Sequence, residues 1–204
     1  MERSINALRA LCDSVVGSNH ETEVGFKRIL SQVDWSGPQR AAKPQDLPLV
    51  EKYFKQTVDM GGDNPMGDLG RALYADAEQL EWFTMYHSYE EDKRLADLHK
   101  NYVIARIAGP GGSWFAEDLT TAITIQGPNT FYPQHAHRQR EVYGVIGGNA
   151  EWQRGAEPWV VRPSGDLIYH SSGLRHALQT REEPLLAFAS WIDHVKETPA
   201  FIWA

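Results

Sequence analysis

The sequence predicts a mainly β protein, in which a helical N-terminal region of residues 1–100 packs on a β-rich region of residues 101–204. Two observations predict this division. Apolar residues recur at helical spacing in the first half of the chain, and short apolar runs bounded by turn residues fill the second half. At 204 residues, with 42% hydrophobic and 23% charged residues, the chain is long enough for one good core and short for two full domains.

Four amphipathic segments predict helices in the first half. Their apolar residues share one helical face and lie within residues 5–15, 26–33, 50–58 and 69–80. Clusters of Gly, Pro, Ser and Asn at 36–38 and 61–65 interrupt the pattern. The charged stretch 90–100 fits either a short helix or a solvated loop. The single cysteine, Cys12, falls on the apolar face of the first segment. We expect it to be buried, and its being alone excludes an intramolecular disulfide and a cysteine-cluster metal site.

From residue 101 onward the pattern is typical of strands. The predicted strands are 102–108, 119–126, 141–146, 150–153, 159–162, 166–169, 177–180 and 185–192. Most gaps between them contain Gly, Pro, Ser or Asn, and Gly147-Gly148-Asn149 is a tight hairpin signal. Many short strands at close spacing indicate an all-β sandwich or barrel.

The charge of the chain restricts its partners. With 20 basic and 27 acidic residues the net charge is −7, and no Lys/Arg-rich run occurs. This balance argues against binding nucleic acid or anionic membrane surfaces, and it tolerates a cationic small molecule. The N-terminal residues carry charges throughout and contain no long apolar stretch, so we expect neither a signal peptide nor a membrane span and predict a cytoplasmic protein. The oligomeric state stays open, with a homodimer through the barrel or the helices as one arrangement.

A short segment rich in metal-ligand residues is the most specific local feature. His135, His137, Glu141 and Tyr143 share one parity, so in extended structure all four side chains would point to one side. Together with His176 they offer a mononuclear metal four ligands and place a phenol beside it. Imidazoles and a carboxylate suit a divalent first-row ion such as zinc, iron, manganese or nickel. Glu141 could instead orient a histidine from outside the ligand set, which would leave three histidines on the metal.

Two groups of residues resemble the two motifs of the cupin superfamily. The first motif combines a glycine, two histidines, a glutamate and a second glycine, matched here by Gly127, His135, His137, Glu141 and Gly148. The second motif is matched by Gly165, Gly173 and His176. Three departures exist: the spacer after Gly127 is longer than usual, Ser171 stands where proline is common, and Thr180 where asparagine is common. The resemblance implies a double-stranded β-helix, or jelly roll, over about half of the chain.

Further residues resemble the cupin-type dimethylsulfoniopropionate lyases of marine bacteria. They are the tripeptides 131–133, 141–143 and 150–152, together with Trp191. This resemblance implies a carbon–sulfur lyase that cleaves a small zwitterion, dimethylsulfoniopropionate, to dimethyl sulfide and acrylate by base-catalysed β-elimination. It also implies one divalent metal ion, held by His135, His137, Glu141 and His176, that binds the substrate carboxylate.

The same resemblance implies roles for four aromatic residues. Tyr143 is the expected base, with packing or a hydrogen bond to a ligand as the alternative. Tyr132 is expected to orient the substrate carboxylate, or else to form part of the aromatic wall. Trp191 and Trp152 offer faces that attract a sulfonium cation, although each would also serve as ordinary core. Three further aromatic residues receive no site role: Tyr102, Trp114 and Tyr169. Five histidines have no ligand spacing and are expected on the surface or in the core: His20, His87, His99, His170 and His194.

Two other functions are compatible with the same residues. One is an iron-dependent oxygenase acting on a small acid or thiol, which would use the same ligands; Tyr143 favours the lyase, since an oxygenase needs oxygen rather than a resident base. The other is a small-molecule-binding protein without catalysis.

Overall fold

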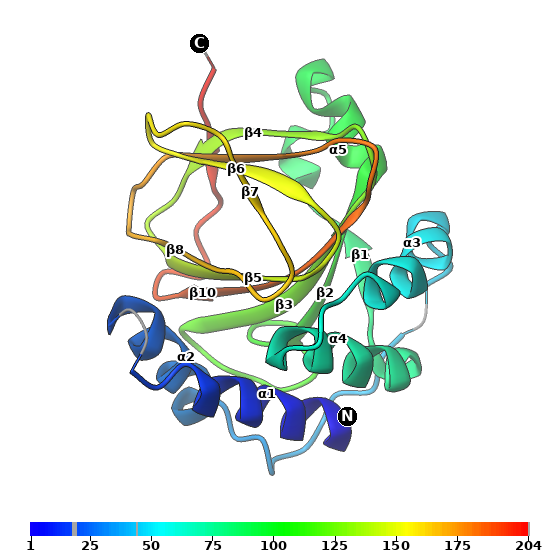
Figure 1. Cartoon of the computed structure of the whole chain (residues 1–204), viewed down its shortest axis with the longest axis vertical. Coiled ribbons are helices and arrows are strands. Elements are labelled where there is room, and N and C mark those ends of the chain that lie inside the picture. The colour runs from blue at the N-terminus through cyan, green and yellow to red at the C-terminus, as the bar shows by residue number, and fades with distance from the viewer. Residues whose placement is uncertain (18–19, 44, 204) are drawn as a thin grey trace.

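The computed structural model describes residues 1–17, 20–43 and 45–203 of the chain. A layer of helices lies along one face of a two-sheet β-barrel (Figure 1). The helices are α1 (Glu2–Ser14), α2 (His20–Gln32), α3 (Pro48–Asp59), α4 (Pro65–Ala75) and α5 (Ala96–Asn101), with 3-10 turns η1 (Ala77–Gln79), η2 (His87–Tyr89) and η3 (Lys93–Leu95). The strands are β1 (Trp82–Thr84), β2 (Tyr102–Ala108), β3 (Leu119–Gln126), β4 (Phe131–Ala136), β5 (Arg140–Gly147), β6 (Ala150–Arg154), β7 (Val160–Arg162), β8 (Leu167–His170), β9 (His176–Thr180), β10 (Leu185–Ile192) and β11 (Ala200–Phe201).

The four predicted helices are present, and local chemistry explains two of their starts. A proline occupies the first turn of both α3 and α4, where its missing N–H leaves no hydrogen bond unmade. The side chain of Asn64 caps α4 by accepting a 2.9 Å hydrogen bond from Gly67 N. The fourth helix ends at Ala75, short of the predicted residue 80, and a 3-10 turn follows. Cys12 is buried in α1, as predicted.

The strands form two antiparallel sheets that make up a jelly roll. One has the order β1-β2-β3-β10-β5-β8 and the other β11-β4-β9-β6-β7. From β3 onward the chain passes from one sheet to the other at every step except between β6 and β7, as in a double-stranded β-helix. The predicted mainly β fold is confirmed. The structure adds β1, β4 and β11, and β1 extends the first sheet with a strand from the region that the sequence predicted to be helical.

Two apolar clusters hold these layers together. One fills the space between the helices and the outer face of the six-stranded sheet, where the rings of Phe26 in α2 and Phe188 in β10 stack 5.8 Å apart. The other fills the barrel interior and is rich in aromatic side chains. Close packing between layers explains Gly144 on β5, because a side chain there would overlap the thioether of Met66 in α4. The helical layer therefore rests directly on the strands that carry Glu141 and Tyr143.

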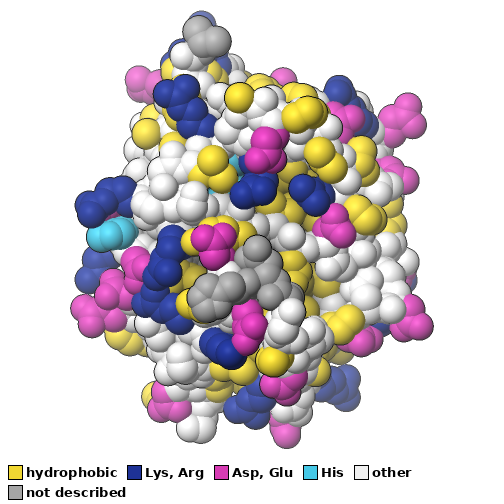
Figure 2. Space-filling model, turned by 60° about the vertical axis from the view of Figure 1, so that its left-hand side comes forward, with side chains coloured by type: hydrophobic (Ala, Val, Ile, Leu, Met, Phe, Trp, Pro, Cys, Tyr) yellow, Lys and Arg dark blue, Asp and Glu magenta, His cyan; other side chains and the backbone are white. Residues whose placement is uncertain are grey.

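The surface carries both signs of charge. On the face shown in Figure 2, Lys and Arg side chains are interspersed with Asp and Glu. Among the described residues, no helix combines the length and the apolar character needed to cross a membrane.

Candidate active site

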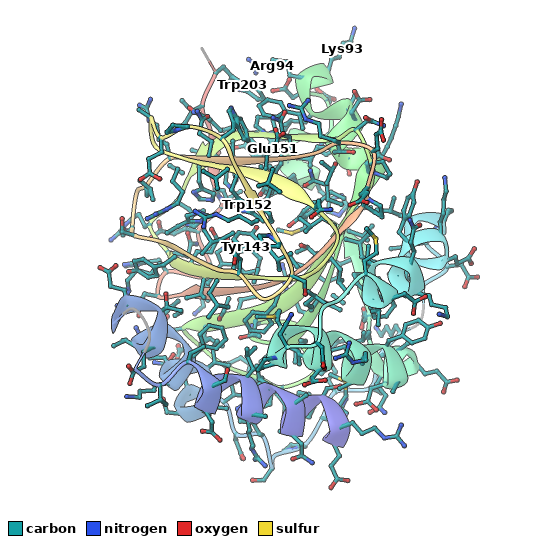
Figure 3. The ribbon with its side chains drawn as sticks, in the orientation of Figure 1. Lys93, Arg94, Tyr143, Glu151, Trp152 and Trp203 are labelled. Carbon is teal, nitrogen blue, oxygen red and sulfur yellow. The ribbon has the colours of Figure 1, made fainter. Side chains whose placement is uncertain are left out.

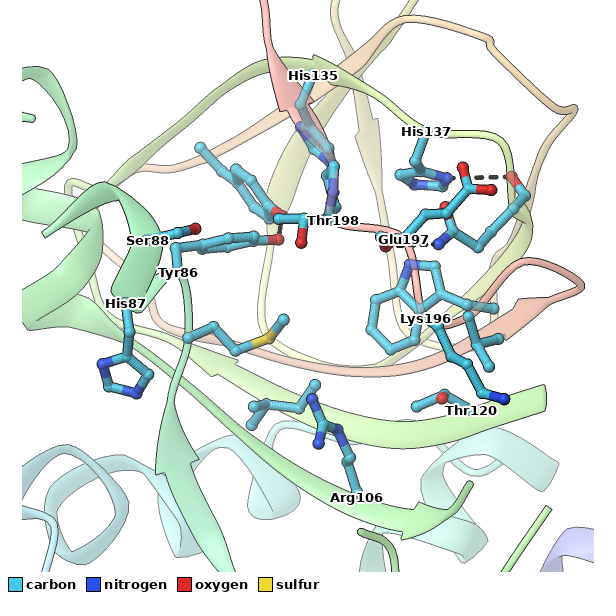
Figure 4. Close-up of a pocket in the computed structure, with 17 residues that line it drawn as sticks. Tyr86, His87, Ser88, Arg106, Thr120, His135, His137, Lys196, Glu197 and Thr198 are labelled. Carbon is cyan, nitrogen blue, oxygen red and sulfur yellow. Dashed lines mark hydrogen bonds between the residues drawn. The ribbon is translucent and has the colours of Figure 1, made fainter. Parts of the chain in front are cut away.

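A cavity of about 290 Å³ opens at one end of the barrel, between the two sheets (Figure 4). The six-stranded sheet contributes one wall and β4 the opposite wall. The loop before η2 and the segment that follows β10 complete it. Its lining includes Tyr86, Tyr132, His135, His137, Gln139 and Trp191.

Three buried histidines converge at the inner end of this cavity. Nδ1 of His135 donates to Pro133 O at 2.9 Å, Nδ1 of His137 to Gln139 O at 3.0 Å, and Nδ1 of His176 to Leu174 O at 2.9 Å. These bonds leave each Nε2 free to bind something else. Candidate ligand atoms of the three residues lie within 4.8 Å of one another. The Nε2 atoms of His137 and His176 are buried and, in the described part of the chain, have no hydrogen-bond partner.

Glu141 adds a buried carboxylate to the three imidazoles. Its Oε2 lies 3.1 Å from Nε2 of His176 and 3.5 Å from Nε2 of His137. Burial alone would raise the pKa of Glu141, but interactions with His176, His137 and His170 outweigh burial and hold that pKa well below its usual value. Burial lowers the pKa of His135 well below its usual value, which keeps this imidazole neutral, as a metal ligand requires.

The donor set fits a divalent metal ion. The described residues form two overlapping groups of possible ligands, one of His135, His137 and His176 and one of Glu141, His170 and His176. The first group together with Glu141, which lies beside His137 and His176, suits zinc, iron, manganese or nickel. Their arrangement differs from the predicted one. His135 lies on β4, His137 in the link after β4, and Glu141 at the start of β5, so these residues come from two sheets rather than one extended strand. A bend after residue 136 brings them together.

His170 is a site residue that the sequence did not predict. It is fully buried, lies directly opposite Glu141 on the neighbouring strand, and donates from Nδ1 to Glu141 Oε2 at 2.8 Å. Burial, followed by the charge of His176, lowers the pKa of His170 to about 4. His170 and the core residue Ile168 are two positions apart, so on a strand both side chains point to the same face, here the interior. This alternation could have identified His170, but the strand predicted there stops at residue 169.

The two predicted catalytic tyrosines occupy different surroundings. Tyr132 lines the cavity, its ring stacks on His135 at 4.3 Å, and its hydroxyl is hydrogen-bonded to Tyr86. Tyr143 lies deeper in the barrel (Figure 3) and is not among the described residues that line the cavity. Burial, reinforced by Tyr102 and Glu141, raises the pKa of Tyr143 well above its usual value. Tyr102, for which the sequence predicted no role, is buried with Tyr143 in the aromatic cluster of the barrel interior.

The two predicted substrate-binding tryptophans also separate. Trp191 lines the cavity and is paired across the sheet with Glu141. Trp152 is buried in the interior, where its ring meets that of Tyr143 at 6.1 Å (Figure 3). It is absent from the cavity wall formed by the described residues.

Two further aromatic residues lie away from the cavity. Trp114 packs on Trp35 with ring centroids 5.3 Å apart, and Tyr169 packs against the helices on the outer face of β8. Both belong to the layer between the helices and the six-stranded sheet.

Comparisons with known proteins agree with this architecture. Residues 21–187 match the family model described as dimethylsulfoniopropionate lyase. The dimethylsulfoniopropionate lyase DddQ of Ruegeria pomeroyi is 25% identical over 116 residues, which cover 57% of this chain and 58% of that protein. The putative dimethylsulfoniopropionate lyase DddL of Cereibacter sphaeroides is 28% identical over 180 residues, which cover 86% of this chain and 74% of that protein.

The fold is also similar to a solved structure along nearly its whole length. The crystal structure of DddQ from Ruegeria pomeroyi superposes with a TM-score of 0.76 at 20% identity, covering 98% of this chain and 96% of that one. The likeness therefore includes the helical layer as well as the barrel. Since the family model spans well over half of the sequence, the chain belongs to the dimethylsulfoniopropionate lyase family, whose members are carbon–sulfur lyases.

Proposed function

We propose that this protein cleaves dimethylsulfoniopropionate to dimethyl sulfide and acrylate by a metal-dependent β-elimination. The observation that carries the proposal is the convergence of three histidines and Glu141 at the end of a cavity that is also lined by Tyr132 and Trp191. A zwitterion with a carboxylate at one end and a sulfonium at the other fits such a cavity. Membership of the lyase family supports the same substrate.

In this proposal His135, His137, Glu141 and His176 hold one divalent ion. A metal bound there supplies a Lewis acid for the substrate carboxylate, which makes the neighbouring C–H bond more acidic. Tyr132 orients that carboxylate from the cavity wall. The indole of Trp191 faces the sulfonium, because an aromatic face attracts a desolvated cation.

The elimination itself needs one base and no strong acid. Tyr143, as phenolate, takes the proton from the carbon next to the carboxylate. The C–H electron pair becomes the new C=C bond, and the C–S pair leaves with sulfur as neutral dimethyl sulfide. Since burial raises the pKa of Tyr143, its phenolate depends on the cationic charge of the sulfonium and the metal site nearby.

Tyr132 is a second candidate for the base, because it lines the cavity. Replacing each tyrosine by phenylalanine separates the two roles. We expect Tyr143→Phe to lower kcat by about 10²–10⁴-fold, the usual contribution of a positioned general base, and Tyr132→Phe mainly to raise KM. A Tyr143→Phe protein within about tenfold of wild type, beside an inactive Tyr132→Phe protein, would reverse the assignment.

The decisive assay is gas-phase detection of dimethyl sulfide above purified metal-loaded protein and dimethylsulfoniopropionate. Dimethyl sulfide and acrylate should form in equal amounts. Oxygen consumption without dimethyl sulfide would indicate the iron-dependent oxygenase instead, and ligand binding without turnover would indicate a binding protein. Running the assay with zinc, iron, manganese and nickel identifies the ions that support turnover.

A further inference from the structure

His170 is a buried histidine that the proposed ligand set does not use. Its Nδ1 donates the 2.8 Å hydrogen bond to Glu141 Oε2. Its ring also stacks on that of His176, with centroids 3.9 Å apart and 19° between the planes. His170 therefore contacts two proposed metal ligands at once, one by a hydrogen bond and one by its ring face.

The position of His170 is fixed by the fold rather than by a flexible loop. It is the last residue of β8, where its Cα is paired with that of Glu141 on β5. Trp191 on β10 is paired with Glu141 from the other side. The three residues form a row across adjacent strands, so the backbone register alone brings His170 to the carboxylate.

The buried carboxylate of Glu141 requires a hydrogen-bond donor beside it. A buried carboxylate is costly unless hydrogen bonds and opposite charges compensate for lost water. Within the described residues, Oε1 of Glu141 has no hydrogen-bond partner, so the groups around Oε2 determine how the carboxylate is oriented. Residues that hydrogen-bond to metal ligands typically change metal affinity by 10–100-fold when they are replaced.

We propose that His170 is a positioning residue of the metal site: its hydrogen bond to Glu141 and its stacking on His176 orient both ligands and thereby set the affinity for the metal. In this proposal His170 acts through Glu141 and His176 rather than as a ligand, even though its ligand atom lies within 4.8 Å of theirs. The inference rests on the metal site of the proposed function, but it is measured by metal binding in the absence of any substrate.

Two substitutions separate the hydrogen bond from the ring. His170→Phe keeps an aromatic ring and removes the donor. His170→Asn loses the ring but keeps a donor nitrogen bonded to Cγ, as Nδ1 of histidine is. We expect Zn²⁺ affinity, measured by competition with a chelator, to fall about 10–100-fold in His170→Phe, with His170→Asn binding clearly more tightly than His170→Phe. Tyr169→Phe, on the outer face of the same strand, is the matched control and should bind Zn²⁺ like wild type.

A double-mutant cycle tests whether His170 acts through Glu141. The His170→Phe change should cost much less Zn²⁺ affinity in a Glu141→Gln background than in wild type, because residues that act as one unit are not additive. Equal losses in both backgrounds would overturn the proposal, and so would wild-type affinity in His170→Phe. Two zinc ions per wild-type chain, of which one disappears with His170→Phe, would make His170 a ligand and overturn it as well.

The test of His170 also covers a variant that does not fold and a protein that has no lyase activity. If His170→Phe does not fold, His170→Gln is used in its place. The amide nitrogen of glutamine is bonded to Cδ rather than to Cγ, so no donor occupies the position of histidine Nδ1. If the Zn²⁺ affinities follow the expected order but no dimethyl sulfide forms with any metal, the proposed activity is contradicted while the role of His170 is supported.

Discussion

At the scale of single residues, the backbone around each site histidine determines the direction of its ring. His135, His137 and His176 each donate Nδ1–H to a carbonyl two positions away in the chain. This local bond selects the tautomer in which Nε2 carries the free lone pair. The three imidazoles are thus oriented by hydrogen bonds that need no ligand, and removing one of them should remove a ligand rather than the fold.

The first prediction concerns His137. His137→Ala should lower both metal content and turnover to near background, because the remaining ligands bind the ion more weakly and leave its coordination incomplete. Elemental analysis and the dimethyl sulfide assay measure the two effects on the same preparation. His194→Ala is the control, since the side chain of His194 is 44% exposed and pairs only with Glu197 and Arg138 in the described structure. Full metal content in His137→Ala would contradict the ligand set.

A second prediction concerns Trp191, which the cavity exposes to substrate. Trp191→Leu should raise KM by about 3–30-fold, because a cation over an indole face gains about 0.5–2 kcal/mol. Trp191→Phe should fall between wild type and Trp191→Leu. Inhibition by acrylate, which has no cation, should hardly change in either variant. A parallel loss of acrylate inhibition would show that the indole only shapes the cavity.

Residue chemistry also explains which site residues the sequence could predict. His135, His137 and Glu141 could be identified from metal-ligand side chains at close spacing, and His176 from the resemblance to the second cupin motif. No motif or ligand spacing in the sequence singles out His170 or Tyr102. Their places depend on which strand lies beside β5 and which residue meets Tyr143, and these are long-range contacts that a single sequence does not contain.

At the scale of elements, the sequence did not predict β4 or the bend that separates it from β5. Residues 131–136 read poorly as a strand because they include Pro133 and polar residues, yet they form β4 in the smaller sheet. Proline is tolerated at strand irregularities, and the pairing of β4 with β9 shifts register between Tyr132 and His135. The eight strands predicted from short apolar runs bounded by turn residues all appear, and several of them, such as β3, are buried along their whole length.

A third prediction concerns the contact between α2 and the barrel. Asp193, just after β10, pairs with Arg28 of α2 at 2.8 Å and with Arg140 at the start of β5. Burial would raise the pKa of Asp193, but the hydrogen bonds from both arginines outweigh it and lower that pKa. A lowered pKa means that the stabilisation is present above the unfolded-state pKa and is lost as pH falls through the folded-state value.

Asp193→Asn should therefore destabilise the protein by about 0.5–1 kcal/mol near neutral pH, a modest value because the pair is partly exposed. The difference in free energy of unfolding from wild type should shrink toward zero below pH ~4. Urea denaturation at several pH values measures it. Asp59→Asn is the control, because Asp59 and its partner Lys55 are both largely exposed, and it should change little. A difference that persists unchanged in acid would rule out the ion pair as its cause.

At the scale of the whole molecule, the helical region and the barrel share one core. The outer apolar cluster runs from Met1, just before α1, to Ile192 in β10, so neither part buries its apolar surface alone. The boundary at residue 101 stays a prediction, and β1, from the N-terminal side of it, pairs with β2 on the other side. Chain length and composition predicted one core with the helical region packed on the barrel, but not which residues form it. The cytoplasmic location and the homodimer stay predictions.

Shared packing predicts a single unfolding transition. Phe26 and Phe188 are fully buried and stack between α2 and β10, so Phe26→Ala should cost about 3–5 kcal/mol, a large part of the stability of an ordinary domain. In wild type and variant alike, far-ultraviolet circular dichroism and tryptophan fluorescence should report coincident midpoints, with the variant unfolding at lower denaturant. If the helices of Phe26→Ala unfolded first and left a folded barrel, the barrel would be stable by itself, and its contacts with the helices would only position the site. Coincident midpoints would instead mean that the helical layer is needed to hold β5, and with it Glu141 and Tyr143, in place.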